Sequence, residues 1–246
     1  MKPSLDEALA DLPNGPQHDC SYLADLQAQH QYFYWHKEQG LLPGDFYQQL
    51  MDRHFRRSGR MFYRPSCVGC TRCISIRMGV GDFIASRSQR RVLGKNSDLT
   101  VRWGPPALDA SRLALYQRYA VERHGGERPS EASTHEFLYD SPTATIEASY
   151  WMGERLVGVG ICDLTPSALS TVYFYFDPDE QVRSLGVFSA LQEIAYARSL
   201  GLRFYYLGYW VKGCAKMEYK AGLGNHELLG KSGWLETARN ISSHKG

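Results

Sequence analysis

Several features that define other protein classes are missing from this chain of 246 residues. No stretch approaches eighteen consecutive apolar residues, so the sequence predicts no membrane-spanning helix. The first sixteen residues carry Asp6, Glu7 and Asp11, where a secretion signal would have a basic start and an apolar run. Six cysteines are too few for a disulfide-stabilised scaffold. These absences favour a cytoplasmic protein without a membrane partner.

A large net charge of either sign is also lacking, since 28 Lys and Arg oppose 26 Asp and Glu to leave +2. The charge is nevertheless unevenly distributed. Between Arg53 and Lys95 there are eleven basic residues and one acid, Asp82, which gives this stretch +10 and the remainder −8. Ten of the eleven are arginine, whose planar donor group fits phosphate or carboxylate. We expect RNA or an acidic peptide as partner; the alternative is pairing with the acidic remainder of the chain.

The hydrophobic periodicity after Asp98 predicts an α+β fold with a mixed sheet. Three central strands joined by tight turns predict an antiparallel meander. The element order, β-α-α-β-β-β-α-β-α-β, is that of the GNAT acyltransferase fold. We therefore expect a GNAT-like domain over 98–246 and, packed against it, a basic, cysteine-containing region over 1–97. The expected strands are 99–103, 144–152, 155–163, 169–176, 203–210 and 227–229, and the expected helices are 113–120, 131–139, 187–200 and 211–221.

The loop between the meander and the next helix bears on the acyl donor. A CoA-dependent enzyme of this fold needs Gln/Arg-x-x-Gly-x-Gly/Ala there, because small residues let backbone N–H groups approach the pyrophosphate. Counted from Gln181, the first glycine is replaced by Ser184; counted from Arg183, the last small residue is replaced by Phe188. The sequence disfavours CoA and indicates another activated acyl group, with a CoA-dependent N-acetyltransferase as an alternative.

Three cysteines spaced as Cys-x-x-Cys-x-x-Cys over 67–73 could converge on one metal ion. A closed zinc site needs four ligands. Cys20 is the favoured fourth donor and His54 a weaker one. Positive charge from Arg64 and Arg72 is expected to lower the pKa of these thiols. The alternative is free thiols without metal, and a zinc-dependent RNA-binding module is the non-enzymatic interpretation.

A strongly aromatic strand is followed by three lysines at helical spacing, Lys212, Lys216 and Lys220. One helix face would then carry three ammonium groups. Such a face is often simply solvated, but the preceding tyrosines could stack on a base or line an acyl pocket. On the last strand of the meander, Tyr173 and Tyr175 face either a pocket or a second core layer.

Together these residues resemble the aminoacyl-tRNA-protein transferases of the N-degron pathway. The first motif has one cysteine, whereas the longer eukaryotic arginyl branch has a second at the position of Leu23, so the chain is more similar to the bacterial leucyl branch. The matching motifs span 20–220 and are Cys20-Ser21-Tyr22-Leu23, Phe55-Arg56-Arg57-Ser58-Gly59, Tyr63-Arg64-Pro65, Cys67, Cys70, Cys73, Ser86-Arg87-Ser88-Gln89-Arg90-Arg91, Lys95-Asn96-Ser97-Asp98-Leu99, Phe176-Asp177-Pro178-Asp179, Leu207-Gly208-Tyr209-Trp210, Lys216-Met217 and Tyr219-Lys220.

The resemblance implies transfer of an aminoacyl group, leucyl or alternatively arginyl, from charged tRNA to the α-amine of proteins that begin with Asp or Glu, which marks them for degradation. It implies no cofactor for the transfer, although an iron-sulfur cluster is associated with early cysteines of the family, here Cys20, Cys67, Cys70 and Cys73. We expect Tyr209, Lys212 and Lys216 to orient the ester and stabilise developing charge. The expected substrate-binding residues are Arg57, Arg77, Arg87, Arg90 and Arg91, shared between the acidic side chain and the tRNA phosphates, together with Tyr173, Tyr175, Tyr219 and Lys220.

Overall fold

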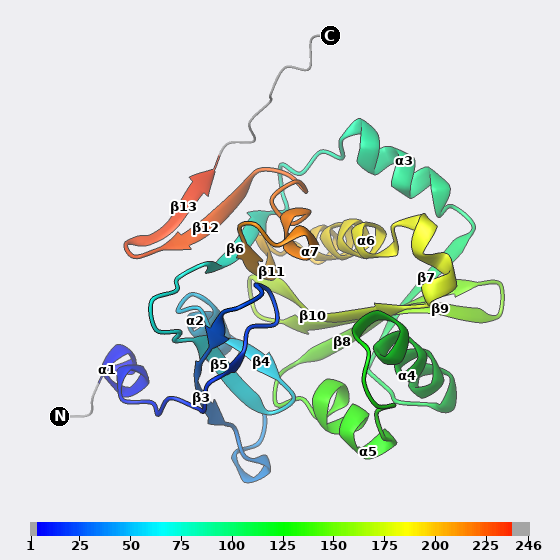
Figure 1. Cartoon of the computed structure of the whole chain (residues 1–246). Helices are drawn as coiled ribbons and strands as arrows, with labels where there is room; N and C mark the ends of the chain where they lie inside the picture. The colour runs from blue at the N-terminus through cyan, green and yellow to red at the C-terminus, as the bar shows by residue number, and fades with distance from the viewer. Residues whose placement is uncertain (1–3, 238–246) are drawn as a thin grey trace.

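The computed structural model describes residues 4–237, and its largest element is a mixed sheet of eight strands (Figure 1). The strand order is β13-β12-β6-β11-β10-β9-β8-β7. All neighbours are antiparallel except β10 and β11, which are parallel. The strands are β6 (Cys73–Gly79), β7 (Leu99–Gly104), β8 (Thr145–Met152), β9 (Arg155–Leu164), β10 (Ala168–Phe176), β11 (Phe204–Val211), β12 (His226–Gly230) and β13 (Gly233–Thr237).

The expected α+β class, the element order and the antiparallel meander β8-β9-β10 are confirmed. One expected helix is wrong in extent: over 211–221 only α7 (Ala215–Glu218) is helical. Gly213 has φ +85°, a left-handed conformation that ends the strand in a turn rather than continuing into a helix. The other helical segments after β6 are α3 (Arg87–Lys95), α4 (Ala110–His124), α5 (Glu131–Thr134), the π-helix η2 (His135–Tyr139), the 3-10 helix η3 (Pro178–Arg183) and α6 (Leu185–Ser199).

Helices cover both faces of the meander. On one face, Leu115 of α4 and Leu138 of η2 pack against Ile161 of β9. On the other face, Phe188 of α6 packs against Tyr150 of β8, with α3 alongside α6. The meander is therefore covered on both faces, and α6 packs against β10.

The N-terminal region forms a smaller sheet, in the order β3-β5-β4, that is packed against the main sheet. Its core holds Tyr47 and Phe62 against Tyr206 of β11. The expected boundary after residue 97 does not separate the two regions, because β6 pairs with β11 and β12 inside the main sheet. The elements before β6 are α1 (Leu5–Ala10), β1 (His18–Asp19), β2 (Gln27–Ala28), β3 (His30–Tyr34), the 3-10 helix η1 (Lys37–Gln39), α2 (Gly44–Met51), β4 (Arg56–Ser58) and β5 (Met61–Pro65).

The parallel strands β10 and β11 pair over only three residues, up to Ser170 opposite Tyr206. Beyond that point each strand carries an irregularity, at Thr171/Tyr173 on β10 and at Tyr206/Gly208 on β11. Bulges of this kind bend a strand and end its pairing with a neighbour. The sheet therefore opens on the side where the N-terminal region approaches it.

Candidate active site

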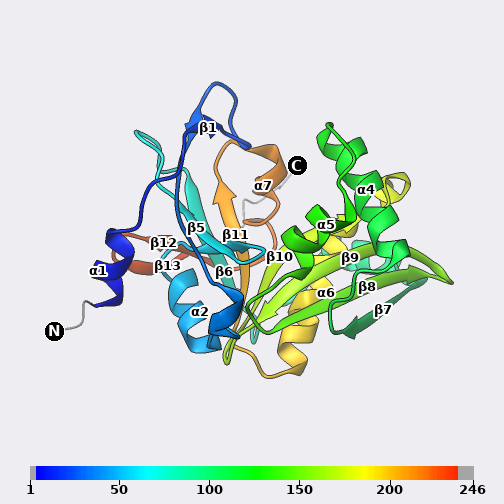
Figure 2. The ribbon, with the colours of Figure 1, turned by 90° about the horizontal axis from the view of Figure 1, so that it is seen from below.

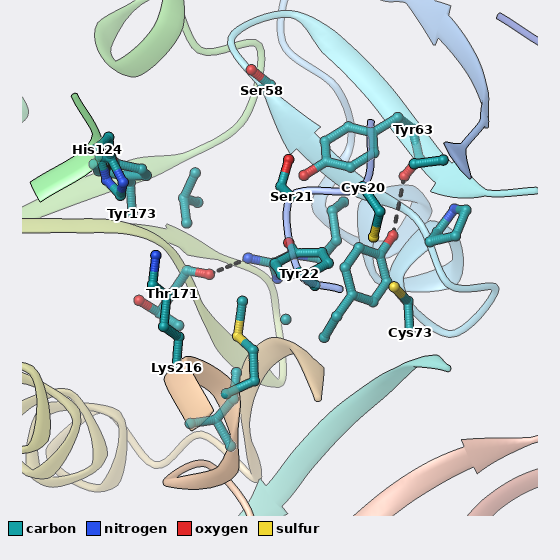
Figure 3. A pocket seen from close by; sticks show the side chains of 18 of the residues that line it. Cys20, Ser21, Tyr22, Ser58, Tyr63, Cys73, His124, Thr171, Tyr173 and Lys216 are labelled. Atoms are coloured by element: carbon teal, nitrogen blue, oxygen red, sulfur yellow. Dashed lines mark hydrogen bonds between the residues drawn. The ribbon is translucent and has the colours of Figure 1, made fainter. Parts of the chain in front are cut away.

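A cavity of about 1040 Å³ lies between the N-terminal region and the opened part of the main sheet. In Figure 2, β1 and α7 stand on one side of this region and α4 and α5 on the other. In Figure 3, Cys20 and Cys73 lie toward one end of the cavity, and Tyr173, His124 and Lys216 lie toward the other. The cavity thus joins residues from both halves of the chain.

The described lining of this cavity is cationic. It includes five Lys and Arg side chains and three histidines, but no Asp or Glu among residues 4–237. Clefts lined by charge of one sign raise the local concentration of ligands of the opposite sign. The Lys and Arg residues of the lining are Arg56, Arg57, Arg123, Lys216 and Lys220, and its histidines are His18, His30 and His124.

Arg57 is neutralised inside the protein. Its Nε and Nη2 donate to the two carboxylate oxygens of Asp163 on β9, each at 2.6 Å, and both side chains are 0% exposed. Burial alone would raise the pKa of Asp163, but the charge of Arg57 outweighs burial and lowers it. This bidentate pair joins β4 to β9, so Arg57 is not available to the substrate as the sequence predicted.

Arg56, the preceding residue, is not neutralised in this way. It is 8% exposed, and its Nη1 donates to Ser170 Oγ at 2.8 Å while Nη2 donates to the carbonyl of Thr171. The guanidinium fills the opening between β10 and β11. A Cβ atom on Gly208 would stand 3.3 Å from its central carbon, so the glycine allows this close approach.

Lys220 lies beside Arg56 in the inner part of the cavity. Its Nζ donates to the carbonyl of Tyr209 at 2.9 Å, and burial, with the charge of Arg56 second, lowers the pKa of Lys220 to about 7. We refer to Arg56 and Lys220 as the inner cationic pair.

Two exposed cations, Arg123 of α4 and Lys216 of α7, lie at the other end of the cavity together with the exposed His124 of α4. Burial, followed by the charges of Lys216 and Arg123, lowers the pKa of His124. The hydroxyl of Tyr173 lies 3.4 Å from His124 Nε2, and Figure 3 shows these two side chains adjacent above Lys216. We refer to Arg123, His124 and Lys216 as the outer cationic group.

The predicted lysine face does not exist, because α7 is short. Lys216 and Lys220 line the main cavity, but Lys212 lines a smaller cavity with Arg72 and Trp210. Tyr209 lines the main cavity, yet its hydroxyl donates to the backbone carbonyl of His54 at 2.5 Å. Tyr209 therefore connects β11 to the N-terminal region, and its hydroxyl is not free to orient an ester.

Of the predicted tyrosines, Tyr173 and Tyr219 line the cavity. Tyr175 is fully buried against α4, and its hydroxyl lies 2.8 Å from that of Tyr139. Tyr173 and Tyr175 are two residues apart and share one face of β10, where both pack in the cluster around α4, so the alternation with phenylalanine does not distinguish them. Phe174 and Phe176, on the other face, line the cavity as well.

The remaining predicted arginines lie outside the cavity lining. Arg77 is held between the rings of Phe204 and Trp234, with its guanidinium carbon 3.9 and 4.2 Å from their centroids, and forms an ion pair with Glu227. Arg77 therefore has a structural role, since it joins β6 to β12. The other three, Arg87, Arg90 and Arg91, are exposed on α3.

Cys20, Cys67, Cys70 and Cys73 all line the cavity as half-buried free thiols. Burial, followed by its cysteine neighbours, raises the pKa of Cys73 to about 12, which opposes the thiolate form that metals bind. Arg64 does not counter this, since its guanidinium donates to Gln31. Within residues 4–237 no group of three or more His, Cys, Asp or Glu side chains is arranged to hold a metal ion. The described residues therefore give no support to zinc or a cluster at these cysteines.

The loop between β10 and α6, which would hold the pyrophosphate in a CoA-dependent enzyme, also reaches the cavity. Gln181, Ser184 and Gly186 line it, and Ser184 adopts a left-handed conformation with φ +56° where η3 meets α6. The start of α6 thus faces the cavity, but serine and Phe188 stand where the small residues of a pyrophosphate loop would be.

Sequence reasoning missed several lining residues, above all Arg56, Tyr22, Tyr63 and His124. Arg56 belongs to one of the family motifs, but nothing in the neighbouring sequence distinguishes it from Arg57. The available signal was only that neighbours on a strand point to opposite faces, so the two arginine side chains would have different surroundings.

This α+β chain, with a cation-lined cavity at the open edge of a parallel strand pair, matches two family models in sequence. They are the arginine-tRNA-protein transferase N terminus over residues 18–91 and C terminus over residues 111–230. The chain belongs to this family of aminoacyl-tRNA-dependent protein transferases.

Curated relatives are named aspartate/glutamate leucyltransferase. The protein from Hahella chejuensis is 37% identical over 223 residues, covering 89% of this chain and 94% of the relative. The protein from Acinetobacter baumannii strain ATCC 17978 is 40% identical over 232 residues, covering 92% and 84%. Among solved structures, the C-terminal domain of a putative lysylphosphatidylglycerol synthetase from Agrobacterium fabrum is 11% identical with a TM-score of 0.46, covering 78% of this chain and 57% of that one.

Proposed function

We propose that this chain transfers a leucyl group from charged tRNA to the α-amine of proteins that begin with Asp or Glu. Family membership and the names of the relatives support this activity. The observation that carries it is the cavity, whose described lining has five Lys and Arg and no carboxylate. Both partners are anionic near the reacting atoms: the tRNA through its 3′ phosphates, and the protein through its first side chain.

The reaction needs little chemistry from the protein. The amine nitrogen attacks the leucyl carbonyl carbon, the new C–N bond forms, the ester C–O bond breaks, and the amine loses a proton as the ribose hydroxyl leaves. An α-amine has a pKa near ~8, so a useful fraction is nucleophilic at neutral pH. Holding the reactants together supplies ~7–11 kcal/mol. Lys216, exposed in the cavity, would stabilise the developing oxyanion, worth ~3–4 kcal/mol.

The lining also bears on which amino acid is moved. Phe174, Phe176 and Met217 supply apolar surface that suits a leucyl side chain. An arginyl side chain would bring a further guanidinium into a cavity that already holds several cations, which is electrostatically unfavourable. The lining therefore favours leucyl over arginyl transfer.

Arg123 and His124 of the outer cationic group and the exposed arginines of α3 are our candidates for contacts with tRNA phosphates. Their exposure suits a polyanion that approaches from solvent. No helix within residues 4–237 is long and apolar enough to cross a membrane. We place the reaction in the cytoplasm, where charged tRNA is available.

The test offers the purified chain labelled Leu-tRNA, Arg-tRNA or acetyl-CoA, with peptides that begin with Asp, Glu, Asn or Lys. We expect leucine on the Asp and Glu peptides alone. Transfer only from Arg-tRNA would overturn the proposed donor. Absence of transfer from either tRNA would overturn the proposed function, and acetylation would favour a CoA-dependent enzyme.

A further inference from the structure

The inner cationic pair has no anionic partner in the described chain. Arg56 donates to a hydroxyl, Ser170 Oγ, and to a carbonyl, that of Thr171, and both acceptors are neutral. Lys220 donates to another neutral carbonyl, that of Tyr209. Within residues 4–237, no Asp or Glu forms an ion pair with Arg56 or Lys220. Arg56 is thus held in a confined space without a counter-ion, next to Lys220.

Burying a charge without a counter-ion is costly, and removing one partner of a buried ion pair is strongly destabilising for this reason. Arg57 shows how this chain otherwise manages a buried arginine, through a bidentate pair with Asp163. Arg56 is nearly as buried, at 8% exposed against 4% for Arg57. An anionic ligand that enters the cavity would supply the missing counter-charge.

The guanidinium has the donors to receive such a ligand. An arginine carries five N–H donors in a planar fork, and two neutral acceptors leave donors for a carboxylate. The neighbouring groups are phenols rather than acids: the charge of Arg56 acts to lower the pKa of both Tyr22 and Tyr63, although burial keeps both raised. Phenol hydroxyls can donate to a carboxylate as well.

We propose that Arg56, supported by Lys220, binds the side-chain carboxylate of the first residue of the protein substrate and so determines its specificity. The identity of this ligand rests on the proposed function. A single side chain can reach a guanidinium that is 8% exposed, whereas a phosphodiester chain suits the exposed outer cationic group better. The α-amine of the same residue would then lie toward Lys216, at the other end of the cavity from Cys73 (Figure 3).

Calorimetry with short peptides that differ only in their first residue tests this directly. The peptides begin with Asp or Asn, which are nearly isosteric and differ in charge, and tRNA is absent. For the unaltered chain we expect binding of the Asp peptide to be about 100-fold tighter than that of the Asn peptide, because losing one member of a buried charged pair has an effect of this order. Arg56→Gln should weaken Asp binding by about 100-fold and remove the preference.

Arg123→Gln is the matched control, since it removes one arginine charge from the same cavity at its exposed end. It should preserve the preference for Asp over Asn. A folded Arg56→Gln variant, checked by circular dichroism, that still prefers Asp would overturn the proposal. Should that variant not fold, Arg56→Met replaces it, and an unchanged preference for Asp in that variant would overturn the proposal equally.

The two claims can fail separately. Leucyl transfer by the unaltered chain, together with an Asp preference that survives in Arg56→Gln, would contradict only the role of Arg56. Absence of transfer, together with an Asp preference that Arg56→Gln abolishes, would contradict only the proposed function and leave an acid-binding site in place.

Discussion

Two neighbouring arginines of β4 lie in opposite electrostatic environments. Arg56 reaches the cavity and meets neutral acceptors, whereas Arg57 turns the other way and meets Asp163. Further from the cavity, Arg77 pairs with Glu227, and Arg112 pairs with Glu147 at 2.7 Å. Arg57, Arg77 and Arg112 thus join elements of the fold through carboxylates, whereas Arg56 meets neutral acceptors inside the cavity.

The comparison teaches that a basic segment need not be a binding surface as a whole. The stretch from Arg53 to Lys95 carries +10. Of its arginines, only Arg56 and Arg57 line the cavity, and Arg57 is neutralised there. Of the others, Arg53, Arg60 and Arg77 pair with acids outside the segment, as the alternative interpretation of the sequence allowed.

The largest expected effect is on stability and concerns Arg57, the arginine of β4 that is paired with a carboxylate. Arg57→Met leaves Asp163 buried without its partner and should lower the free energy of unfolding by about 3–5 kcal/mol. Urea denaturation followed by fluorescence measures it. Combining Arg57→Met with Asp163→Leu should recover part of the loss. A decrease below about 1 kcal/mol in the single variant would contradict the role of this pair.

The next effect concerns the outer end of the cavity. Lys216→Met should lower kcat/KM for leucyl transfer by about 100-fold or more, because it removes a donor aimed at developing charge. Lys212→Met is the matched control, since Lys212 lines the smaller cavity instead. Similar losses in both variants, measured with labelled Leu-tRNA and an Asp peptide, would remove the distinction between the two lysines.

A smaller effect should appear in the pH dependence of stability. Burial first, and the charge of Arg56 second, lower the pKa of Lys220 to about 7, against about 10.4 in the unfolded chain. Between these values the unfolded state binds more protons, so this lysine makes the free energy of unfolding rise with pH, by at most about 1.4 kcal/mol per unit. Lys220→Met should remove that contribution between pH 7 and 9.5. Parallel pH profiles of the two proteins in urea denaturation would contradict the shift.

The smallest effect concerns tRNA affinity. Each of Arg87→Gln, Arg90→Gln and Arg91→Gln should reduce the slope of log affinity against log salt by about 1 if the residue contacts a phosphate. Lys37→Gln, an exposed cation outside the basic segment with a side chain 71% exposed, should leave the slope unchanged. Filter binding across salt concentrations decides this, and equal slopes for all four variants would remove α3 from the tRNA interface.

Much of the fold could be predicted, because its signals are local. Alternating patterns and turn residues placed the three strands of the meander to within about a residue, and Ser130 caps α5 as expected, accepting from Ser133 N at 3.1 Å. The features that could not be predicted depend on contacts between residues far apart in the chain. The membership of β6 in the main sheet depends on pairing with β11, more than a hundred residues later, and no local pattern encodes it.

The site was harder to predict for the same reason. Lys216, Tyr173 and the four cysteines line the cavity, while the roles expected of them stay predictions. The spacing of the cysteines said nothing about burial, which raises the pKa of Cys73 rather than lowering it. Motif membership likewise could not tell a neutralised arginine from an unpaired one.

The amino-acid sequence by itself determined the α+β element order, the family and the concentration of positive charge in one segment, because these depend on residue type and spacing along the chain. Only the tertiary structure decided which cations lack a counter-ion. That distinction depends on whether Asp163 or the opened sheet lies opposite a given guanidinium, and the folded arrangement alone brings residues so far apart in the chain face to face.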